Sequence, residues 1–227
     1  MKLSVLMPAF NERPTIDVII EKVLAEDLVH ELIIVDDGST DGTREFLKTR
    51  AYSEPRVQVF LHELNQGKGA AIRTALERAS GDIAIIQDAD LEYSPSDYAA
   101  VIQPIVEGVS KVSYGSRVLG GENDYPLDSF RAGSYVVTQA ANLLFGCRLT
   151  DEPTCYKAFE MDFLKSLPLE SVGFELCPEL TGWARKRGQT IVEVPIRYDK
   201  RSIEEGKKIR WRDGVIALWT LLKVRVK

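Results

Sequence analysis

Short apolar runs alternate with helix-like segments in the first part of the chain, and this alternation limits the possible folds more than any other feature. The runs are Leu3–Met7, Leu32–Val35, Val57–Leu61 and Ile83–Ile86. Continuous apolar runs of about four to eight residues are typical of strands that are covered on both faces. Because helical segments separate the runs, we expect parallel strands. The pattern predicts an α/β fold with a Rossmann-like, mostly parallel central sheet and helices on both faces.

Helical spacing marks the segments between and beyond these runs. Thr15 is expected to cap the first helix, which carries Val18 and Leu24. The other expected helices include or span Phe46–Leu47, Ala70–Ala79, Tyr98–Val106, Phe130–Phe145, Phe174–Arg187 and a final segment from about Asp213. Further strands are expected at Val112–Ser116 and Ile191–Ile196, with a flexible loop at Gly120–Asp128. No repeat or linker divides the sequence, so one domain is predicted over residues 1–227.

The composition is that of an ordinary globular protein, since 44% of the 227 residues are hydrophobic and 28% are charged. No window reaches the roughly 20 apolar residues that span a bilayer; the nearest candidate is Val215–Leu222. The three cysteines, Cys147, Cys155 and Cys177, show neither metal-ligand spacing nor a disulfide framework. An odd cysteine count without a secretion signal predicts a cytoplasmic location.

The net charge of -5 is unevenly distributed along the chain. From Lys200 to the end there are nine Lys and Arg residues but only three Asp and Glu residues. A basic end on an acidic body is expected to meet an anionic partner, and phosphates, acidic lipid headgroups and nucleic acid all qualify. The final helix also carries Trp211 and Trp219, which fits a membrane surface. The alternative to an anionic partner is a solvated basic helix, and the alternative to a membrane surface is packing of the final helix against the body.

Three carboxylates, Asp88, Asp90 and Glu92, stand at alternate positions directly after the strand Ile83–Ile86. In extended geometry such side chains point to one side, where they repel one another unless a cation is bound. Oxygen ligands suit a hard divalent cation, so Mg²⁺ or Mn²⁺ is predicted. The alternative is a turn and helix cap ahead of Pro95.

Polar residues also follow two other strands. Asp36 and Asp37 end the second strand, where Asp37, and secondarily Asp36, is expected to accept hydrogen bonds from a base or ribose. An Asx turn is the alternative. The loop Gly67-Lys68-Gly69 precedes a helix and is a candidate phosphate site. It matches neither the P-loop nor the dinucleotide-binding glycine pattern.

Basic residues beyond the fourth strand suggest a phosphate-rich substrate pair. They are Arg117, Arg131, Lys200, Arg201, Lys207, Lys208, Arg210 and Arg212. His30 and His62 are interpreted as structural or surface residues, because no Ser-His-Asp or Cys-His arrangement is suggested.

The motifs occur together in an order that resembles family 2 glycosyltransferases with the GT-A fold. They are Val5–Glu12, Val35–Asp41, Asn65–Gly69 and Asp88–Leu91, followed by Gly115–Arg117, Arg131 and Val194–Tyr198. Within the family, the chain looks most like dolichol-phosphate mannosyltransferases and bacterial polyprenyl-phosphate glycosyltransferases. The resemblance implies a nucleotide-sugar-binding half at 1–117 and an acceptor-binding half at 118–227.

The resemblance also implies residue roles. The nucleoside would contact Pro8, Phe10, Glu12, Val35 and Asp37. The donor diphosphate and the metal would be held by Lys68, Asp88, Ala89, Asp90 and, for the metal, Glu92, where many relatives have Gln. Phosphate of the acceptor or donor would meet Arg117, Arg131 and Ser134, with Arg201 and Lys207 or Lys208 closing over the site. Asp90 and Arg117 are the expected catalytic residues. The spacing from Arg201 to Lys208 is longer and more acidic than the family's usual Arg-x-x-Gly-x-Ser-Lys pattern.

The implied reaction is inverting transfer of a hexose from GDP-mannose or UDP-glucose to a polyprenyl or dolichyl phosphate. Such an acceptor is already an anion, so no catalytic base is named. Transfer to a hydroxyl of a sugar or small molecule is the alternative, and it would need a base such as Asp128 or Glu175. A third possibility is a non-catalytic nucleotide- or lipid-binding module. No nucleic-acid partner is expected, and the enzyme would act in the cytoplasm or at the cytoplasmic face of a membrane.

Overall fold

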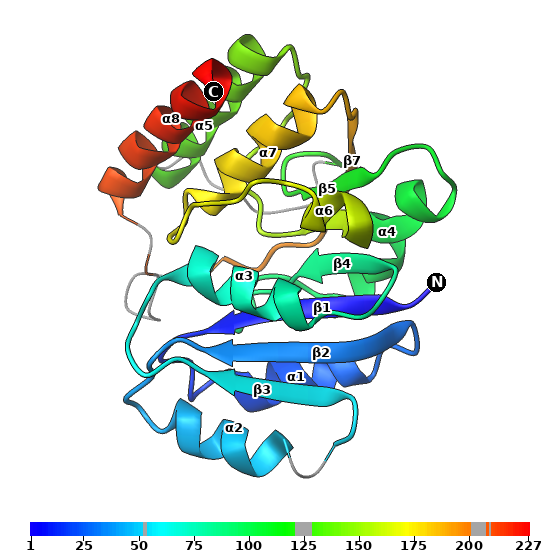
Figure 1. Ribbon diagram of the computed structural model, residues 1–227, viewed down its shortest axis with the longest axis vertical. Helices are drawn as coiled ribbons and strands as arrows, with labels where there is room; N and C mark the ends of the chain where they lie inside the picture. The colour runs from blue at the N-terminus through cyan, green and yellow to red at the C-terminus, as the bar shows by residue number, and fades with distance from the viewer. Residues whose placement is uncertain (52–53, 121–128, 201–207, 209) are drawn as a thin grey trace.

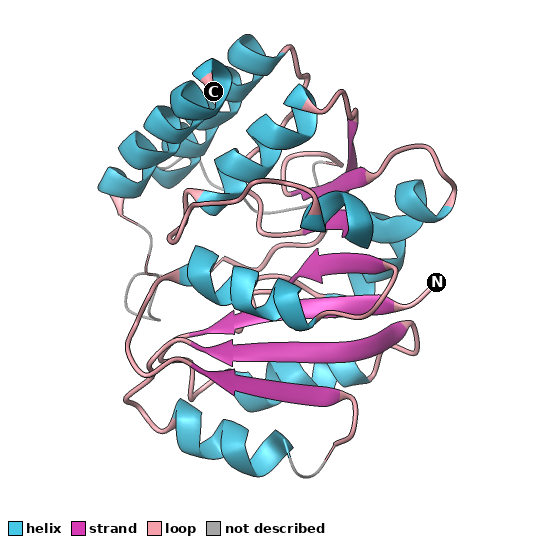
Figure 2. Ribbon diagram, in the orientation of Figure 1, coloured by secondary structure: helices cyan, strands magenta, loops and turns pink. Residues whose placement is uncertain are grey.

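One seven-stranded sheet, with the strand order β3-β2-β1-β4-β6-β5-β7, forms the centre of the molecule (Figure 2). The computed structural model describes residues 1–51, 54–120, 129–200, 208 and 210–227. The strands are β1 (Leu3–Ala9), β2 (Val29–Asp36), β3 (Val57–Leu61), β4 (Ile83–Ile86), β5 (Val112–Ser116), β6 (Lys157–Glu160) and β7 (Ile191–Pro195). Strands β1 to β4 pair in parallel, as do β5 and β7. The predicted mostly parallel α/β sheet is therefore confirmed.

Strand β6 runs antiparallel to both of its neighbours, β4 and β5. This strand is not predicted from the sequence, because the charged residues Lys157 and Glu160 bound its short apolar pair. Lys157 is nevertheless fully buried, and its Nζ donates to Glu152 O at 2.7 Å. A buried ammonium is tolerated only where partners of this kind compensate its lost hydration. The partner comes from the preceding loop, so local hydropathy could not reveal the strand.

Helices cover both faces of the sheet, with α3 on one face and α1 on the other (Figure 1). The helices are α1 (Ile16–Leu24), α2 (Thr43–Ala51), α3 (Lys68–Arg78), the 3₁₀ turn η1 (Pro95–Asp97), α4 (Tyr98–Val106), α5 (Ser129–Phe145), α6 (Met161–Lys165), α7 (Leu176–Lys186) and α8 (Trp211–Val226). Helices α5, α7 and α8 pack against one another beside the β5–β7 end of the sheet (Figure 1). In the part of the chain that the structure describes, no helix combines the length and apolar character needed to cross a membrane.

The register of the parallel strands places their polar ends together. Pro8 lies opposite Val35, and Ala9 lies opposite Asp36. On the other side of β1, Leu6 lies opposite Ile86. The segments that follow β1, β2 and β4 therefore leave the sheet at the same edge, where open α/β sheets bind ligands.

Candidate active site

Two contacts join the segments that follow β1, β2 and β4. The backbone N–H of Asp37 donates to Ala9 O at 2.8 Å. The Thr15 hydroxyl donates to Ala89 O at 3.0 Å and so fixes the Asp88–Asp90 segment beside the β1 loop. Thr15 occupies the predicted N-cap position of α1, but its side chain makes no capping hydrogen bond to that helix.

Asp37 is a buried anchor for the loop that precedes α3. Its Oδ1 accepts from Gln66 N at 2.9 Å, and its Oδ2 accepts from Gly67 N at 2.7 Å. His62 Nδ1 lies 2.7 Å from the same Oδ1, while its Nε2 contacts Thr74. The carboxylate that was predicted to meet the nucleoside therefore organises the adjacent loop in this structure. His62 holds that carboxylate, a partnership that the sequence did not suggest.

Asp36 is fully buried beside it and forms an ion pair with Arg44, with 2.8 Å between Oδ2 and Nε. Its other oxygen, Oδ1, has no hydrogen-bond partner among the described residues. Buried carboxylate oxygens usually accept a hydrogen bond, so this atom is an exception among the described residues.

Lys68, at the start of α3, points to the Asp88-Ala89-Asp90 segment. Its Nζ lies 2.5 Å from Asp88 Oδ1 and 3.3 Å from Cys155 Sγ, with the Phe174 ring centroid at 5.6 Å. Burial works against the ammonium charge, but the Asp88 carboxylate prevails and holds the pKa of Lys68 well above its ordinary value. Burial in turn raises the pKa of the Cys155 thiol, which therefore stays protonated.

The glycines on either side of Lys68 serve a close backbone approach. A Cβ at Gly69 would lie only 2.7 Å from Ser171 O. The first turn of α3 also donates to this neighbouring loop, because Ala70 N bonds Val172 O at 3.0 Å. The two glycines are thus explained by packing against the 171–173 loop. The phosphate role predicted for Gly67-Lys68-Gly69 rests on Lys68.

The acidic segment supplies hard oxygen donors that fit Mg²⁺ or Mn²⁺. Asp90 is buried and its Oδ1 accepts from Glu92 N at 3.0 Å, whereas Asp88 is partly exposed beside Lys68. Among the residues that the structure describes, no three His, Cys, Asp or Glu side chains gather closely enough to form a metal cage. Mg²⁺ commonly uses one or two carboxylates, with waters and substrate phosphate oxygens completing its shell. Asp88 and Asp90 fit that mode, while the third-ligand role of Glu92 stays a prediction.

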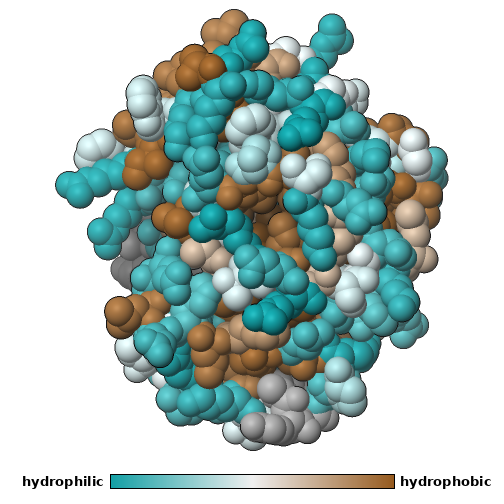
Figure 3. All heavy atoms as spheres, in the orientation of Figure 1, coloured by the Kyte–Doolittle hydropathy of each residue, from teal (hydrophilic) through white to brown (hydrophobic). Residues whose placement is uncertain are grey.

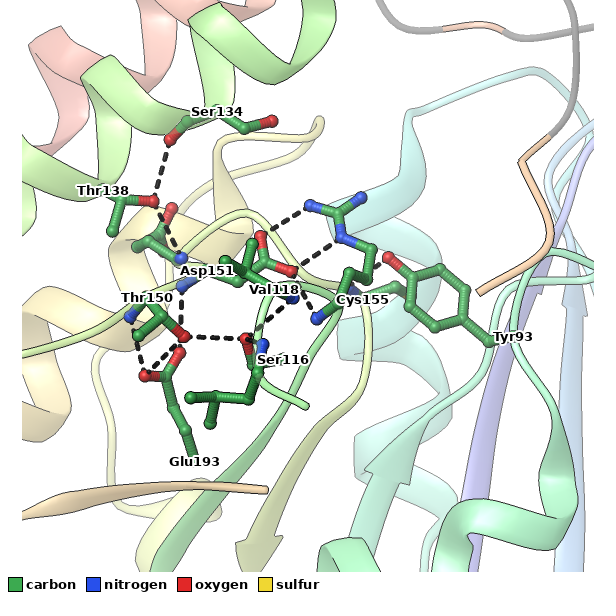
Figure 4. A network of polar contacts seen from close by, with 12 residues as sticks. Tyr93, Ser116, Val118, Ser134, Thr138, Thr150, Asp151, Cys155 and Glu193 are labelled. Atoms are coloured by element: carbon green, nitrogen blue, oxygen red, sulfur yellow. Dashed lines mark hydrogen bonds and ion pairs between the residues drawn. The ribbon is translucent and has the colours of Figure 1, made fainter. Parts of the chain in front are cut away.

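Arg117 follows β5 and is held side-on by Asp151, which Figure 4 labels within its polar network. The Nε and Nη2 groups donate to the two carboxylate oxygens at 2.7 Å each, and the Arg117 backbone N donates to Asp151 Oδ2 at 3.0 Å. Burial alone would raise the pKa of Asp151, but the charge and hydrogen bonds of Arg117 lower it. The pairing uses one edge of the guanidinium and turns the Nη1–Nη2 edge away from Asp151. The fork is thereby held in one orientation.

The remaining acceptor-side predictions fall in three places. Arg131 and Ser134 lie in the first turns of α5 and are half-buried. Lys208 reaches the nucleotide-binding half: its Nζ donates to Phe10 O and lies 2.6 Å from Glu12 Oε1. Arg201, Lys207 and the alternative base Asp128 lie outside the described residues. The other alternative base, Glu175, accepts from Val172 N and Gly173 N, so it holds its own loop.

Comparison with known proteins agrees with this geometry. Residues 4–167 match the model of the family described as Glycosyl transferase family 2. The chain is 31% identical to the UDP-N-acetylglucosamine–dolichyl-phosphate N-acetylglucosaminyltransferase of Methanococcus voltae, over 91% of this chain and 90% of that protein. It is 27% identical to the undecaprenyl-phosphate mannosyltransferase of Micrococcus luteus, over 100% and 99% of the two chains.

The fold is also similar to solved structures of glucosyl-3-phosphoglycerate synthase from Mycobacterium tuberculosis. The complex with Mg²⁺ and UDP superposes with a TM-score of 0.73 at 25% identity, covering 99% of this chain and 79% of that one. The complex with Mn²⁺, UDP and glucosyl-3-phosphoglycerate gives 0.71 at 25% identity, over 99% and 80%. The fold and site thus define a glycosyltransferase of the GT-A class. The chain belongs to glycosyl transferase family 2, so the expected family, fold and enzyme class are confirmed.

Proposed function

We propose that this enzyme transfers a hexose from a nucleotide sugar to a polyprenyl phosphate with inversion at the anomeric carbon. The observation that carries the proposal is the Lys68–Asp88 pair beside Asp90, at the edge where β1, β2 and β4 end. It places a fixed cation and two carboxylates where a donor diphosphate would enter. The relatives named for dolichyl-phosphate and undecaprenyl-phosphate transfer support the same reading.

The donor half of the site, within residues 1–117, would bind the nucleoside diphosphate. Asp88 and Asp90 would hold a divalent cation, which when bound stabilises the negative charge that develops on the leaving diphosphate. Lys68 would supply a second positive charge to the same phosphates. Structures of the tuberculosis enzyme with Mg²⁺ or Mn²⁺ and UDP support this arrangement.

The acceptor half, within residues 118–227, would receive the phosphate of the lipid, with Arg117 at the boundary between the halves. The Arg117 fork would hold the acceptor phosphate oxygens in line with the anomeric carbon. Arg131 and Ser134, at the start of α5, would flank it. A phosphate anion attacks without losing a proton, so the reaction needs no general base.

The α5–α8 end of the molecule would bring the enzyme to its lipid acceptor. Along α8, one stripe of large apolar side chains is exposed: Trp211, Val215, Trp219, Leu222 and Val226. Figure 3 shows apolar atoms at the surface over this end, interspersed with hydrophilic ones. The same helix carries Arg212, Lys223 and Arg225 against one acid, Asp213. An apolar stripe with tryptophans and a basic flank fits an anionic membrane surface.

Transfer assays test the proposal directly. The purified protein is incubated with Mn²⁺, a short polyprenyl phosphate and a panel of GDP-mannose, UDP-glucose and UDP-N-acetylglucosamine. We expect one donor to give a lipid-linked sugar with inverted anomeric configuration. Absence of lipid-linked product across the panel, while sugar transfers to a soluble acceptor, would contradict it.

A second candidate function is transfer to the hydroxyl of a small phosphorylated acceptor. It is favoured by the fold similarity to an enzyme whose structures contain phosphoglyceric acid and glucosyl-3-phosphoglycerate. The panel above, repeated with phosphoglyceric acid in place of polyprenyl phosphate, separates the two candidates. Product only with phosphoglyceric acid would select this second function.

A further inference from the structure

The orientation of Arg117 depends on Asp151, which lies in the loop between α5 and β6. A loop residue needs its own support if it is to hold a guanidinium in one place. Three hydrogen bonds from two consecutive residues of this loop converge on a single carboxylate, that of Glu193 in β7 (Figure 4). Thr150 N and Thr150 Oγ1 donate to Oε2 at 2.7 and 3.1 Å, and Asp151 N donates to Oε1 at 3.0 Å.

The sheet places Glu193 and Arg117 on paired strands. Strand β7 pairs with β5 in parallel, with Glu193 opposite Tyr114, and β5 ends at Ser116 immediately before Arg117. The Ser116 and Thr150 hydroxyls are 2.7 Å apart, which closes the network between the strand end and the loop. Arg117 is therefore fixed through its backbone by β5 and through its side chain by the loop that Glu193 holds.

A second carboxylate beside Asp151 is costly. Burial and the neighbouring Asp151 charge raise the pKa of Glu193, although its three hydrogen bonds favour the ionised form. A neutral side chain on this edge strand would avoid like-charge repulsion. The placement is explained if the carboxylate orients both the Thr150 and Asp151 backbone N–H groups, because its two oxygens accept one N–H each.

We propose that Glu193 is a positioning residue for the transfer reaction: it fixes the Thr150–Asp151 backbone so that Asp151 presents the Arg117 fork to a phosphate group. The inference rests on the proposed function, in which Arg117 receives the acceptor phosphate. If the bidentate donor is displaced by a fraction of an ångström, its hydrogen bonds to the anion weaken more in the transition state than in the ground state.

Glu193→Gln is the direct test, since it preserves size and removes one acceptor oxygen. We expect kcat/KM for polyprenyl phosphate to fall about tenfold, the scale at which outer partners of a site act, with the KM for nucleotide sugar unchanged. Thr150→Val should act in the same direction and Thr150→Ser should restore activity, because serine keeps the hydroxyl. Glu160→Gln is the matched control, because Glu160 lies in β6 of the same sheet and its carboxylate pairs with Lys111. It should retain wild-type kinetics.

A double-mutant cycle separates positioning from general support. In an Arg117→Lys background, Glu193→Gln should have almost no further effect on kcat/KM, because the fork that it orients is gone. Additive losses, or equal changes in both KM values, would overturn the proposal.

A readout independent of activity keeps the two proposals distinguishable. The Arg117 Nε–Hε NMR resonance, assigned by its loss in Arg117→Lys, should shift or broaden in Glu193→Gln and stay unchanged in Glu160→Gln. If the wild type transfers no sugar but this resonance responds, the proposed function fails, while the orientation of Arg117 by Glu193 stands. An unchanged resonance in Glu193→Gln would refute the positioning role.

Discussion

Lys68 Nζ lies 2.5 Å from Asp88 Oδ1, at the point where the first turn of α3 meets the segment that follows β4. The pair joins the glycine loop to the acidic segment and neutralises one of its carboxylates. A donor diphosphate that binds a metal at Asp88 and Asp90 would meet this ammonium as well. The charge of Lys68 is secure, because Asp88 holds the pKa of Lys68 well above its ordinary value despite burial.

Replacement of Lys68 by methionine is expected to weaken nucleoside diphosphate binding. The change keeps the length of the side chain but removes a charge-assisted contact worth about 1.5–3 kcal/mol, which corresponds to roughly tenfold or more in Kd. Calorimetric titration with the diphosphate and with the unphosphorylated nucleoside checks this. If the substitution weakened binding of both ligands equally, Lys68 would support the fold rather than contact the phosphates.

Gly69→Ala is expected to destabilise the protein by about 1–3 kcal/mol, because the new methyl group would overpack the 171–173 loop. Gly133→Ala is the control, since a Cβ at Gly133 meets no atom within 4 Å and the residue lies in a helix. Alanine there should be neutral or stabilising. Urea unfolding of both variants measures the difference, and equal stabilities would contradict the packing account.

Asp151→Asn should lower stability in a pH-dependent way. The pKa of Asp151 is below its ordinary value of 3.8 in the folded protein, so the carboxylate stabilises the fold above 3.8 and loses this contribution as pH falls through the folded pKa. At neutral pH the variant removes the carboxylate charge that compensates the buried Arg117 guanidinium, at a cost of about 3–5 kcal/mol. The difference in the free energy of unfolding between variant and wild type should narrow below the ordinary carboxyl pKa of 3.8. A difference that widens on acidification would contradict this account.

Trp219→Ser should reduce binding to vesicles that contain anionic lipid. Trp219 is 67% exposed on the apolar stripe of α8, and its indole would enter the interface. Leu64→Ser is the matched control, because Leu64 is 78% exposed and lies in the loop between β3 and α3. Vesicle co-sedimentation is the measurement, and equal losses in both variants would argue against a specific membrane face.

The first half of the fold could be predicted because its strands are continuous apolar runs and its polar clusters follow them directly. Asp88-Ala89-Asp90, Asp37 and Lys68 do lie at one edge of the sheet, as the motif order indicates. Parallel pairing brings strand ends together regardless of the loops between them. For this part of the site, local pattern and global topology agree.

The contacts that complete the site could not be predicted because they join distant segments. Glu193 is one acidic residue in an edge strand, and its importance emerges only from the loop that it holds. The resemblance predicts that Lys207 or Lys208 closes over the site, but not that Lys208 pairs with Glu12. His62 gains its role only when the fold brings it to Asp37. Isolated polar residues carry no periodic signal, so three-dimensional packing alone identifies their partners.

The central claim is that Asp88 and Asp90 hold a divalent cation together with a nucleoside diphosphate. The most direct measurement is thermal unfolding with UDP or GDP, with and without Mn²⁺, on the wild type, on Asp90→Asn and on the control Asp82→Asn, whose carboxylate accepts from Lys2 N away from the site. Ligands that bind the folded state raise its apparent stability. We predict a rise in Tm with one diphosphate that requires Mn²⁺ and is lost only in Asp90→Asn. A diphosphate-dependent rise that persists in Asp90→Asn, or that needs no metal, would contradict the account.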